Sequence, residues 1–185
     1  MHLQNIWDNQ ITFDLDSELG QTLRVARLYS DVPVEALRHA RDADRLTPLD
    51  PAPAIDDAAL ADMTNIVALA GAEQIQTAIN TGADVVLAGR ATDTATIAAL
   101  PLAHGAHAGG AWHGAKIAEC GAFCTTRPAS GVIMVSFDET GFTVMPMGEG
   151  VQCTPQSVAA HMLYENSDPW ILHEPGGHLD VTAAT

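Results

Sequence analysis

Hydrophobic and polar positions follow two periods along this chain, and each period predicts a different kind of element. The uninterrupted apolar run from Val85 to Ala88 is typical of a strand that is covered on both faces in a parallel sheet. Alternation over residues 23–29 predicts a second strand, and positions 34–43 and 93–102 are typical of helices. The order helix, strand, helix over residues 72–102 indicates an α/β fold.

Proline and glycine mark boundaries between further elements. Three prolines fall within residues 47–54, which we interpret as a linker, and two helices are expected between residues 55 and 81. Glycine and histidine are frequent over residues 104–114, which predicts a loop. A short helix is expected to follow this loop, through Lys116 to Cys120.

The pattern changes after residue 130. Alternating runs over residues 132–137 and 141–146 predict a β-hairpin, and Thr154-Pro155 is typical of a helix start. We therefore expect an α/β fold, with a parallel sheet flanked by helices and a β-hairpin extension after residue 130. The length of 185 residues suits a single α/β domain or a fragment of a larger one. The chain stops on what reads as the start of an element, which favours the fragment.

Charge and cysteine content narrow the classes of partner. The chain has 8 Lys and Arg against 23 Asp and Glu, and a formal charge of −15 disfavours binding to nucleic acid or to an anionic membrane surface. No apolar run approaches the roughly 20 residues of a membrane span, and the N-terminus lacks the pattern of a signal peptide. Three cysteines argue against a secreted disulfide framework, so a cytoplasmic location is expected.

The end of the predicted strand at residue 88 carries the first candidate site. Gly89 permits a sharp turn that would deliver Arg90, Thr92 and Asp93 to the carboxyl end of the strand, the edge at which α/β proteins bind ligands. We interpret Gly89, Arg90 and Thr92 as substrate-binding residues. The guanidinium of Arg90 can bind a carboxylate or a phosphate through two hydrogen bonds. Asp93 is the candidate base. The structural alternative is that Asp93 caps the next helix and Arg90 forms an ion pair.

Glu119 and Cys120 form a second candidate. A carboxylate there could act as acid or base in a hydration or an elimination, and the thiol could act as a nucleophile or a ligand. The alternative is that Cys120 is a packing residue, as small buried cysteines usually are.

Two groups of histidines also carry possible chemistry. His104, His107 and His113 lie close in sequence to two cysteines, and nitrogen and sulfur ligands suit zinc; the alternative is a solvated loop. The segment His173–His178 places two imidazoles and Glu174 in one turn, where a general base or a metal ligand could lie; the alternative is an exposed Pro-Gly turn.

Several segments, taken in order and with their spacing, resemble the acyclic terpene utilisation family. The segments that carry the resemblance are residues 71–75, 82–93, 119–121, 154–158, 163–165 and 168–169. The resemblance covers roughly residues 65–185, whereas residues 1–64 do not resemble the glycine-rich opening of family members. It implies a cytoplasmic bacterial role in degrading terpenoid or branched acids as CoA thioesters, through a hydratase or lyase step.

These observations give three functional hypotheses. The first is a catabolic enzyme, or part of one, that acts on a branched or terpenoid carboxylic acid or its CoA thioester, with Arg90 holding a carboxylate and Asp93 or Glu119 moving the proton. The second is a non-catalytic subunit of a hetero-oligomer, and the third is a metal-dependent hydrolase that uses His104, His107 and His113. We expect a small-molecule substrate and a homo- or hetero-oligomer. No cofactor is predicted beyond a CoA-linked substrate, and a divalent metal stays open.

Overall fold

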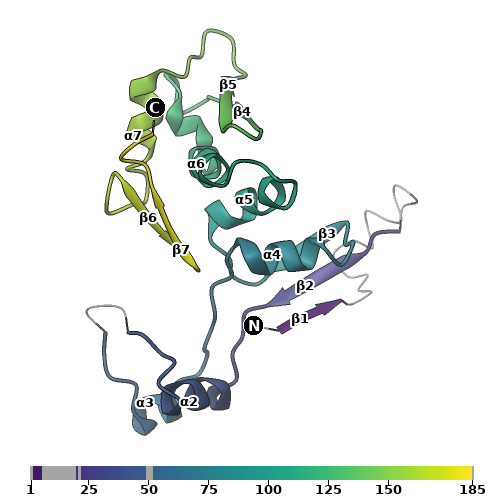
Figure 1. Ribbon diagram of the computed structural model, residues 1–185, viewed down its shortest axis with the longest axis vertical. Helices are drawn as coiled ribbons and strands as arrows, with labels where there is room; N and C mark the ends of the chain where they lie inside the picture. Colours follow the sequence, from purple (N-terminus) through teal and green to yellow (C-terminus); the bar gives the residue numbers. More distant parts are fainter. Residues whose placement is uncertain (1, 6–19, 21, 49–51, 185) are drawn as a thin grey trace.

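The structure is a computed structural model that describes residues 2–5, 20, 22–48 and 52–184. Its central helices form a stack between a small sheet and two β-hairpins (Figure 1). The strands are β1 (His2–Asn5), β2 (Val25–Tyr29), β3 (Val85–Ala88), β4 (Ile133–Phe137), β5 (Phe142–Pro146), β6 (Ile171–Glu174) and β7 (Gly177–Asp180). The helices are α2 (Val34–Asp42), α3 (Asp57–Asp62), α4 (Ala72–Ile79), α5 (Asp93–Ala103), α6 (Ala108–Ala118), the short 3-10 helix η1 (Gly121–Cys124) and α7 (Pro155–His161).

The sheet that contains the predicted strands is small and mixed. Strands β2 and β3 are parallel, with Val25 opposite Val85, and β1 pairs with the other edge of β2 in the antiparallel sense. The class of mixed helices and strands is confirmed, but an extended parallel sheet is not. The expectation that β3 is covered on both faces is also wrong, because none of its four residues is buried: Val85 is half-buried and Ala88 is exposed. The strand also lies at the edge of this sheet.

Small side chains allow helices α4, α5 and α6 to pack closely on one another. The alanines that face the neighbouring helix in α5 and α6 are fully buried, and they are Ala95, Ala98, Ala99, Ala111 and Ala115. Leu28 of β2 and Ile75 of α4 join this core, which connects the helical stack to one face of the sheet. Figure 1 shows the three helices as successive layers beside β2 and β3.

Helix α6 occupies much of the stretch that was predicted to be a loop. The prediction of a loop over residues 104–114 is wrong, since α6 begins at Ala108, and the helix predicted to reach Cys120 ends at Ala118. Glycine has low helix propensity, but the lack of a side chain at Gly110 and Gly114 allows the β4–β5 hairpin to lie directly against the helix. Tertiary packing therefore outweighs the local preference of the sequence.

This close approach predicts opposite effects for two neighbouring alanine substitutions. A methyl group at Gly110 would lie 2.6 Å from the Cα atom of Gly141, so Gly110→Ala should destabilise the protein by about 1–3 kcal/mol. Gly109 is exposed, and its nearest new contact would be an ordinary 3.4 Å to His107, so Gly109→Ala should stabilise α6 by roughly 0.5–1 kcal/mol. Urea unfolding of both variants measures the difference. Equal free energies of unfolding in the two variants would contradict the close contact between Gly110 and Gly141.

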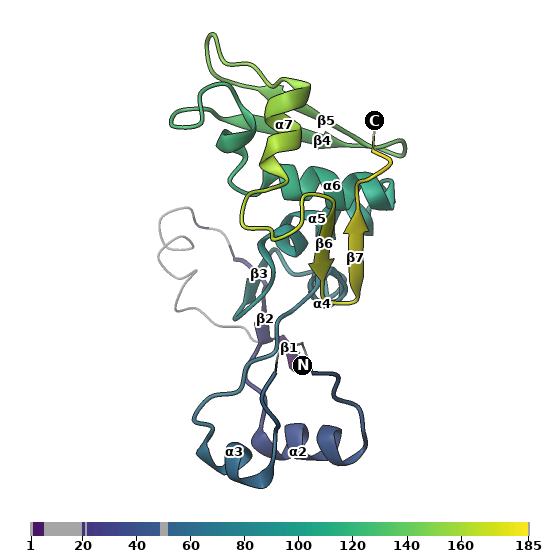
Figure 2. The same cartoon turned by 90° about the vertical axis from the view of Figure 1, so that its left-hand side faces the viewer.

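A second core joins the hairpins and α7 to the end of α6. Its buried members are Ile117, Cys124, Met162, Leu179 and Val181. The β4–β5 hairpin that was predicted over residues 132–146 is confirmed, as is the helix start at Thr154, whose hydroxyl accepts a hydrogen bond from the Ser157 amide at 3.1 Å. Figure 2 shows the β6–β7 hairpin running along the side of the stack, from the level of α6 to that of α4.

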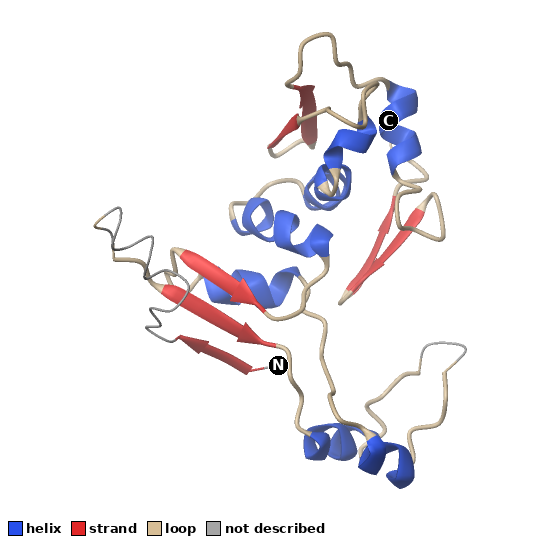
Figure 3. Ribbon diagram, turned by 180° about the vertical axis from the view of Figure 1, so that it is seen from behind, coloured by secondary structure: helices blue, strands red, loops and turns tan. Residues whose placement is uncertain are grey.

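Helices α2 and α3 form an arm that extends away from the rest of the molecule (Figure 3). The chain leaves and returns through a narrow neck, where the Val32 amide donates to the Ile66 carbonyl at 2.8 Å and the Ala68 amide donates to the Ser30 carbonyl at 2.7 Å. The described part of the predicted linker at 47–54 has no regular structure; residues 49–51 lie outside the described residues. None of the helices in the described part of the chain has the length and apolar character that crossing a bilayer requires.

Candidate active site

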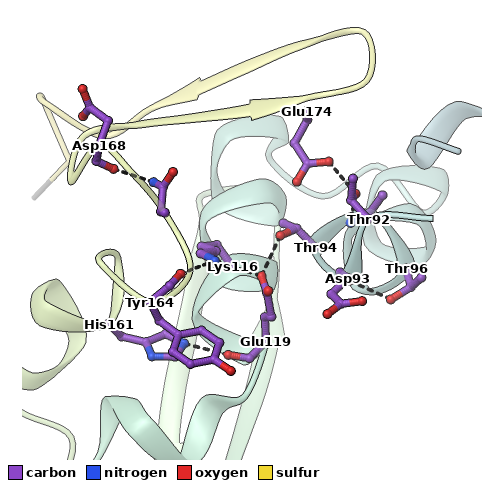
Figure 4. Close-up of polar contacts among 12 residues, drawn as sticks. Thr92, Asp93, Thr94, Thr96, Lys116, Glu119, His161, Tyr164, Asp168 and Glu174 are labelled. Carbon is purple, nitrogen blue, oxygen red and sulfur yellow. Dashed lines mark hydrogen bonds and ion pairs between the residues drawn. The ribbon is translucent and has the colours of Figure 1, made fainter. Parts of the chain in front are cut away.

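A buried ion pair lies where the start of α5 meets the end of α6. The Lys116 ammonium is 3.1 Å from the Glu119 carboxylate, and the two side chains are only 2% and 10% exposed. The hydroxyl of Thr94 donates to the same carboxylate oxygen at 3.0 Å (Figure 4). Charged groups lose their hydration on burial, so these neighbours are what keeps both charges stable inside the protein.

The helical spacing of the sequence explains why these two side chains meet. Lys116 precedes Glu119 by three residues at the end of α6, so both side chains project from the same face. The ammonium also lies in the last turn of the helix, where exposed carbonyl groups favour a positive charge. A further hydrogen bond, from Lys116 Nζ to the carbonyl oxygen of Tyr164 at 2.8 Å, ties the ion pair to the segment after α7.

Glu174 brings a second carboxyl group to this site from the end of β6. The hydroxyl of Thr92, the N-cap residue of α5, donates to its Oε2 at 2.5 Å. Burial raises the pKa of Glu174, and the negative charge of Glu119 acts in the same direction; the hydrogen bond from Thr92, the nearby Thr94 hydroxyl and the charge of Lys116 oppose them. The site thus holds two carboxyl groups and one ammonium, joined by threonine hydroxyls (Figure 4).

A small cavity opens beside Glu174. It has a volume of about 230 Å³, and its lining includes Glu73, Trp112, Glu174 and His178. Glu73 lies in the first turn of α4 and is exposed, and its carboxylate fits beside Gly176, where an added methyl group would meet Glu73 Oε1 at 3.2 Å. Two carboxyl groups in different surroundings therefore line the same cavity, an arrangement found where one acts as an acid and the other as a base.

His161 closes the other side of the buried pair. This last residue of α7 is 3% exposed, and its Nε2 lies 2.7 Å from the backbone carbonyl oxygen of Glu119, so Nε2 carries the proton and donates. Its Nδ1 is buried without a hydrogen-bond partner among the described residues. Burial lowers the pKa of His161 and the Lys116 charge adds to this, whereas the bond to Glu119 opposes it. The ring is therefore neutral at neutral pH.

Lys116, Glu119, Thr94 and His161 together form a buried cluster, and Tyr164 covers this cluster on the side of Cys120. Its ring stacks on His161, with centroids 5.5 Å apart, and the Lys116 ammonium lies 5.7 Å from the centre of the tyrosine ring. A side-chain hydrogen bond with Cys120, followed by burial, raises the pKa of Tyr164 to about 12. The Tyr164 phenol therefore keeps its proton at neutral pH.

The predicted substrate-binding residues lie at the carboxyl end of β3. Gly89 and Arg90 line an open groove of about 430 Å³, together with residues of β2 and the neck. Ser30 holds their turn, since its hydroxyl oxygen accepts a hydrogen bond from the Arg90 amide at 2.7 Å. Thr92 is the N-cap and binds Glu174, while Asp93 is the exposed first residue of α5 and does not line the groove. Within the described residues, no ion pair or hydrogen bond joins the Arg90 and Asp93 side chains.

The structure separates the other two predicted catalytic residues. Glu119 lies inside the buried cluster, whereas Cys120 is exposed, adopts a left-handed backbone with φ +47°, and lines a different groove of about 460 Å³ beside Phe123 and Ile133. The proposed role of Cys120 as a nucleophile stays a prediction.

The histidines of the predicted loop lie in three different settings. His107 caps α6 and accepts a hydrogen bond from the Gly110 amide at 3.0 Å, and His104 follows the last turn of α5. His113 packs edge-on against Phe142, and burial lowers its pKa. Among the described residues, no three His, Cys, Asp or Glu side chains form a group that could hold a metal ion. His173 and His178 do face each other across the β6–β7 turn, with ring centres 6.1 Å apart.

Sequence reasoning missed the roles of Lys116, Thr94, His161 and Tyr164. The one available signal is the composition, because Lys116 is the only lysine of a strongly acidic chain and lies in a helix of small residues. The contacts of His161 and Tyr164 with this helix join residues more than 40 positions apart, which no local pattern encodes.

Together, these features define a mixed helix-and-strand protein with a buried acid–base cluster beside a small cavity. Comparison with models of known protein families matches residues 9–185 to the family described as acyclic terpene utilisation family protein AtuA. The chain therefore belongs to this family. The match begins well upstream of residue 65, so the expectation that residues 1–64 lack the resemblance is wrong. Searches of curated proteins and of solved structures found no match.

Proposed function

We propose that this protein is an enzyme that adds water to, or removes water from, a branched or terpenoid carboxylic acid or its CoA thioester. Membership of the acyclic terpene utilisation family supports the class of substrate. The observation that carries the chemistry is Glu174, a half-buried carboxyl group with a raised pKa that lines the same cavity as Glu73. A carboxyl group that keeps its proton closer to neutral pH suits a general acid.

The two carboxyl groups complete a balanced hydration of a double bond conjugated to a carbonyl group. Glu73, as a carboxylate, accepts a proton from water while the water oxygen bonds to the β-carbon. Glu174 gives its proton to the α-carbon and becomes a carboxylate, which the Thr92 hydroxyl and the Lys116 charge stabilise. Elimination follows the same steps in reverse. Neither direction oxidises or reduces the substrate.

Arg90 is proposed to hold the anionic part of the substrate. It lines the groove at the carboxyl end of β3, and it precedes Thr92 by two residues, so their Cα atoms are at most about 7 Å apart. A guanidinium there can bind a carboxylate, or a phosphate of CoA, while Glu174, which is bonded to Thr92, acts on the carbon chain. In this assignment Glu119 positions and stabilises the site from within the protein, and the role of Asp93 as a base stays a prediction.

Deuterium exchange tests this function directly. The protein in D₂O, mixed with 3-methylbut-2-enoate or its CoA thioester as a branched probe, should add deuterium at the α-carbon and form the 3-hydroxy product, both of which mass spectrometry detects. Exchange without net hydration would still support proton transfer by this site. Absence of both with every branched acid and thioester offered would contradict the proposal.

A non-catalytic subunit is the competing function. The outer face of the β4–β5 hairpin favours it, because four apolar side chains are exposed there, namely Val132, Met134, Met145 and Met147. A protein that fails the exchange test and elutes as a larger complex only with an added second protein would match this function.

A further inference from the structure

Two cysteines that the proposed reaction does not use lie face to face in the second core. The Sγ atoms of Cys124 and Cys153 are 3.9 Å apart, and neither thiol is bonded to another cysteine. Cys124 ends η1 and is fully buried, whereas Cys153 precedes α7 and is partly exposed. The pair therefore has one buried cysteine and one that is partly exposed.

The backbone already holds the two cysteine-bearing segments together. The Thr126 amide donates to the Gln152 carbonyl at 2.8 Å, and the Gln152 amide donates to the Thr126 hydroxyl oxygen at 3.1 Å. A disulfide bond is about 2 Å long, so closure needs the sulfur atoms to approach by about 2 Å, a distance that side-chain rotation can supply while these backbone bonds persist.

We propose that Cys124 and Cys153 form a reversible disulfide in response to a small disulfide such as oxidised glutathione. The inference is independent of the proposed catalytic function, and it assigns these residues as a modification site.

The exchange chemistry proceeds in two balanced steps. The Cys153 thiol loses a proton, its thiolate attacks one sulfur of oxidised glutathione, and one glutathione leaves as a thiolate that takes up a proton. The Cys124 thiol then loses its proton and attacks the Cys153 sulfur, which releases the second glutathione. The protein loses two hydrogens, and the small disulfide is reduced to two thiols.

The environment of Cys124 makes the second step slow and dependent on pH. Burial, and then the charge and hydrogen bond of Cys153, raise the pKa of Cys124 to about 12. Attachment of glutathione to Cys153 removes the contributions of its thiolate and leaves the effect of burial. The thiolate is the attacking species. Ring closure should therefore accelerate roughly tenfold for each unit by which the pH is raised, as long as the pH stays below the pKa of the Cys124 thiol.

The cross-link would clamp the elements that hold the buried cluster. Cys124 follows the end of α6, where Glu119 lies, and Cys153 precedes α7, which carries His161. Closing the loop between them should raise the melting temperature by about 5 °C or more, because it restricts the unfolded chain.

The experiment uses the full chain and oxidised glutathione. After incubation at pH 7 and pH 8.5 and blocking of free thiols, cleavage after glutamate separates residues 120–139 from residues 150–165, so that mass spectrometry detects the link between them. Cys120 shares the first peptide, so a Cys120→Ser variant serves as the matched control.

We expect the cross-linked peptide in the wild-type protein and in Cys120→Ser, with faster closure at pH 8.5 and full reversal by dithiothreitol. Cys124→Ser should stop at a Cys153–glutathione adduct. Glutathione adducts without a cross-link in the wild-type protein, a cross-link that Cys120→Ser abolishes, or disulfide-linked dimers alone would each overturn the proposal.

Discussion

Replacing Glu174 with glutamine should lower kcat by about 10²–10⁴-fold while the protein keeps its fold, because glutamine preserves the shape of the side chain but cannot give up a proton. Thr92 can still donate its hydroxyl hydrogen bond, at 2.5 Å in the wild-type protein, to the amide oxygen. The measurement is the rate of hydration or of α-carbon deuterium exchange, together with a melting curve that shows the variant to be folded.

The pH profile separates this role from a merely structural one. The pKa of Glu174 is raised, and a general acid acts in its protonated form, so wild-type kcat in the hydration direction should fall as pH rises through that pKa. The residual activity of Glu174→Gln should lack this descending limb. An unchanged limb in the variant would assign the proton transfer to another group.

Two further variants test whether the loss of kcat is specific to Glu174. Glu149→Gln makes the same chemical change on an exposed loop and should leave kcat unaltered. Arg90→Lys keeps the charge but loses the two-pronged hydrogen bonding of a guanidinium, so it should raise KM more than it lowers kcat. A loss of kcat equal to that of Glu174→Gln would instead place Arg90 at the reacting atoms.

Local patterns predicted the elements well where a single period dominates. The apolar run at β3, the alternation of β4 and β5, and the cap and proline at Thr154 and Pro155 all identified elements that the structure contains. The extent and covering of the sheet were not predictable in this way, because an apolar strand of four residues reads the same at the edge of a sheet as in its centre. The glycines of α6 misled for a related reason, since their function is to admit another element rather than to break a helix.

The site could be predicted only in pieces. Arg90, Glu119 and the turn around Glu174 were singled out by residue type and position, but nothing in the sequence indicated that Thr92 and Glu174, 82 positions apart, are in contact. Nor could the sequence indicate that the charge of Lys116 acts on Glu174. Hydrogen bonds of such long range are set by the packing of α5, α6 and β6, so they follow from the fold and not from motif spacing.

The buried ion pair predicts the largest effect on stability. Lys116→Met fills a similar volume but leaves the Glu119 carboxylate, which is 10% exposed, without its counter-charge. Removing one partner of a buried pair costs about 3–5 kcal/mol, since the remaining charge stays poorly hydrated. Urea unfolding followed by circular dichroism should show a loss of this size.

The double variant distinguishes an unpaired charge from lost packing. Adding Glu119→Gln to Lys116→Met removes the stranded carboxylate while Thr94 can still donate to the amide oxygen, so most of the lost stability should return. Arg38→Met breaks an ion pair with Asp57 on the surface of the arm, where Asp57 is 74% exposed, and should cost about 1 kcal/mol or less. A Lys116→Met variant as stable as Arg38→Met, or a double variant no better than the single one, would show that the Lys116–Glu119 pair does not hold the site together.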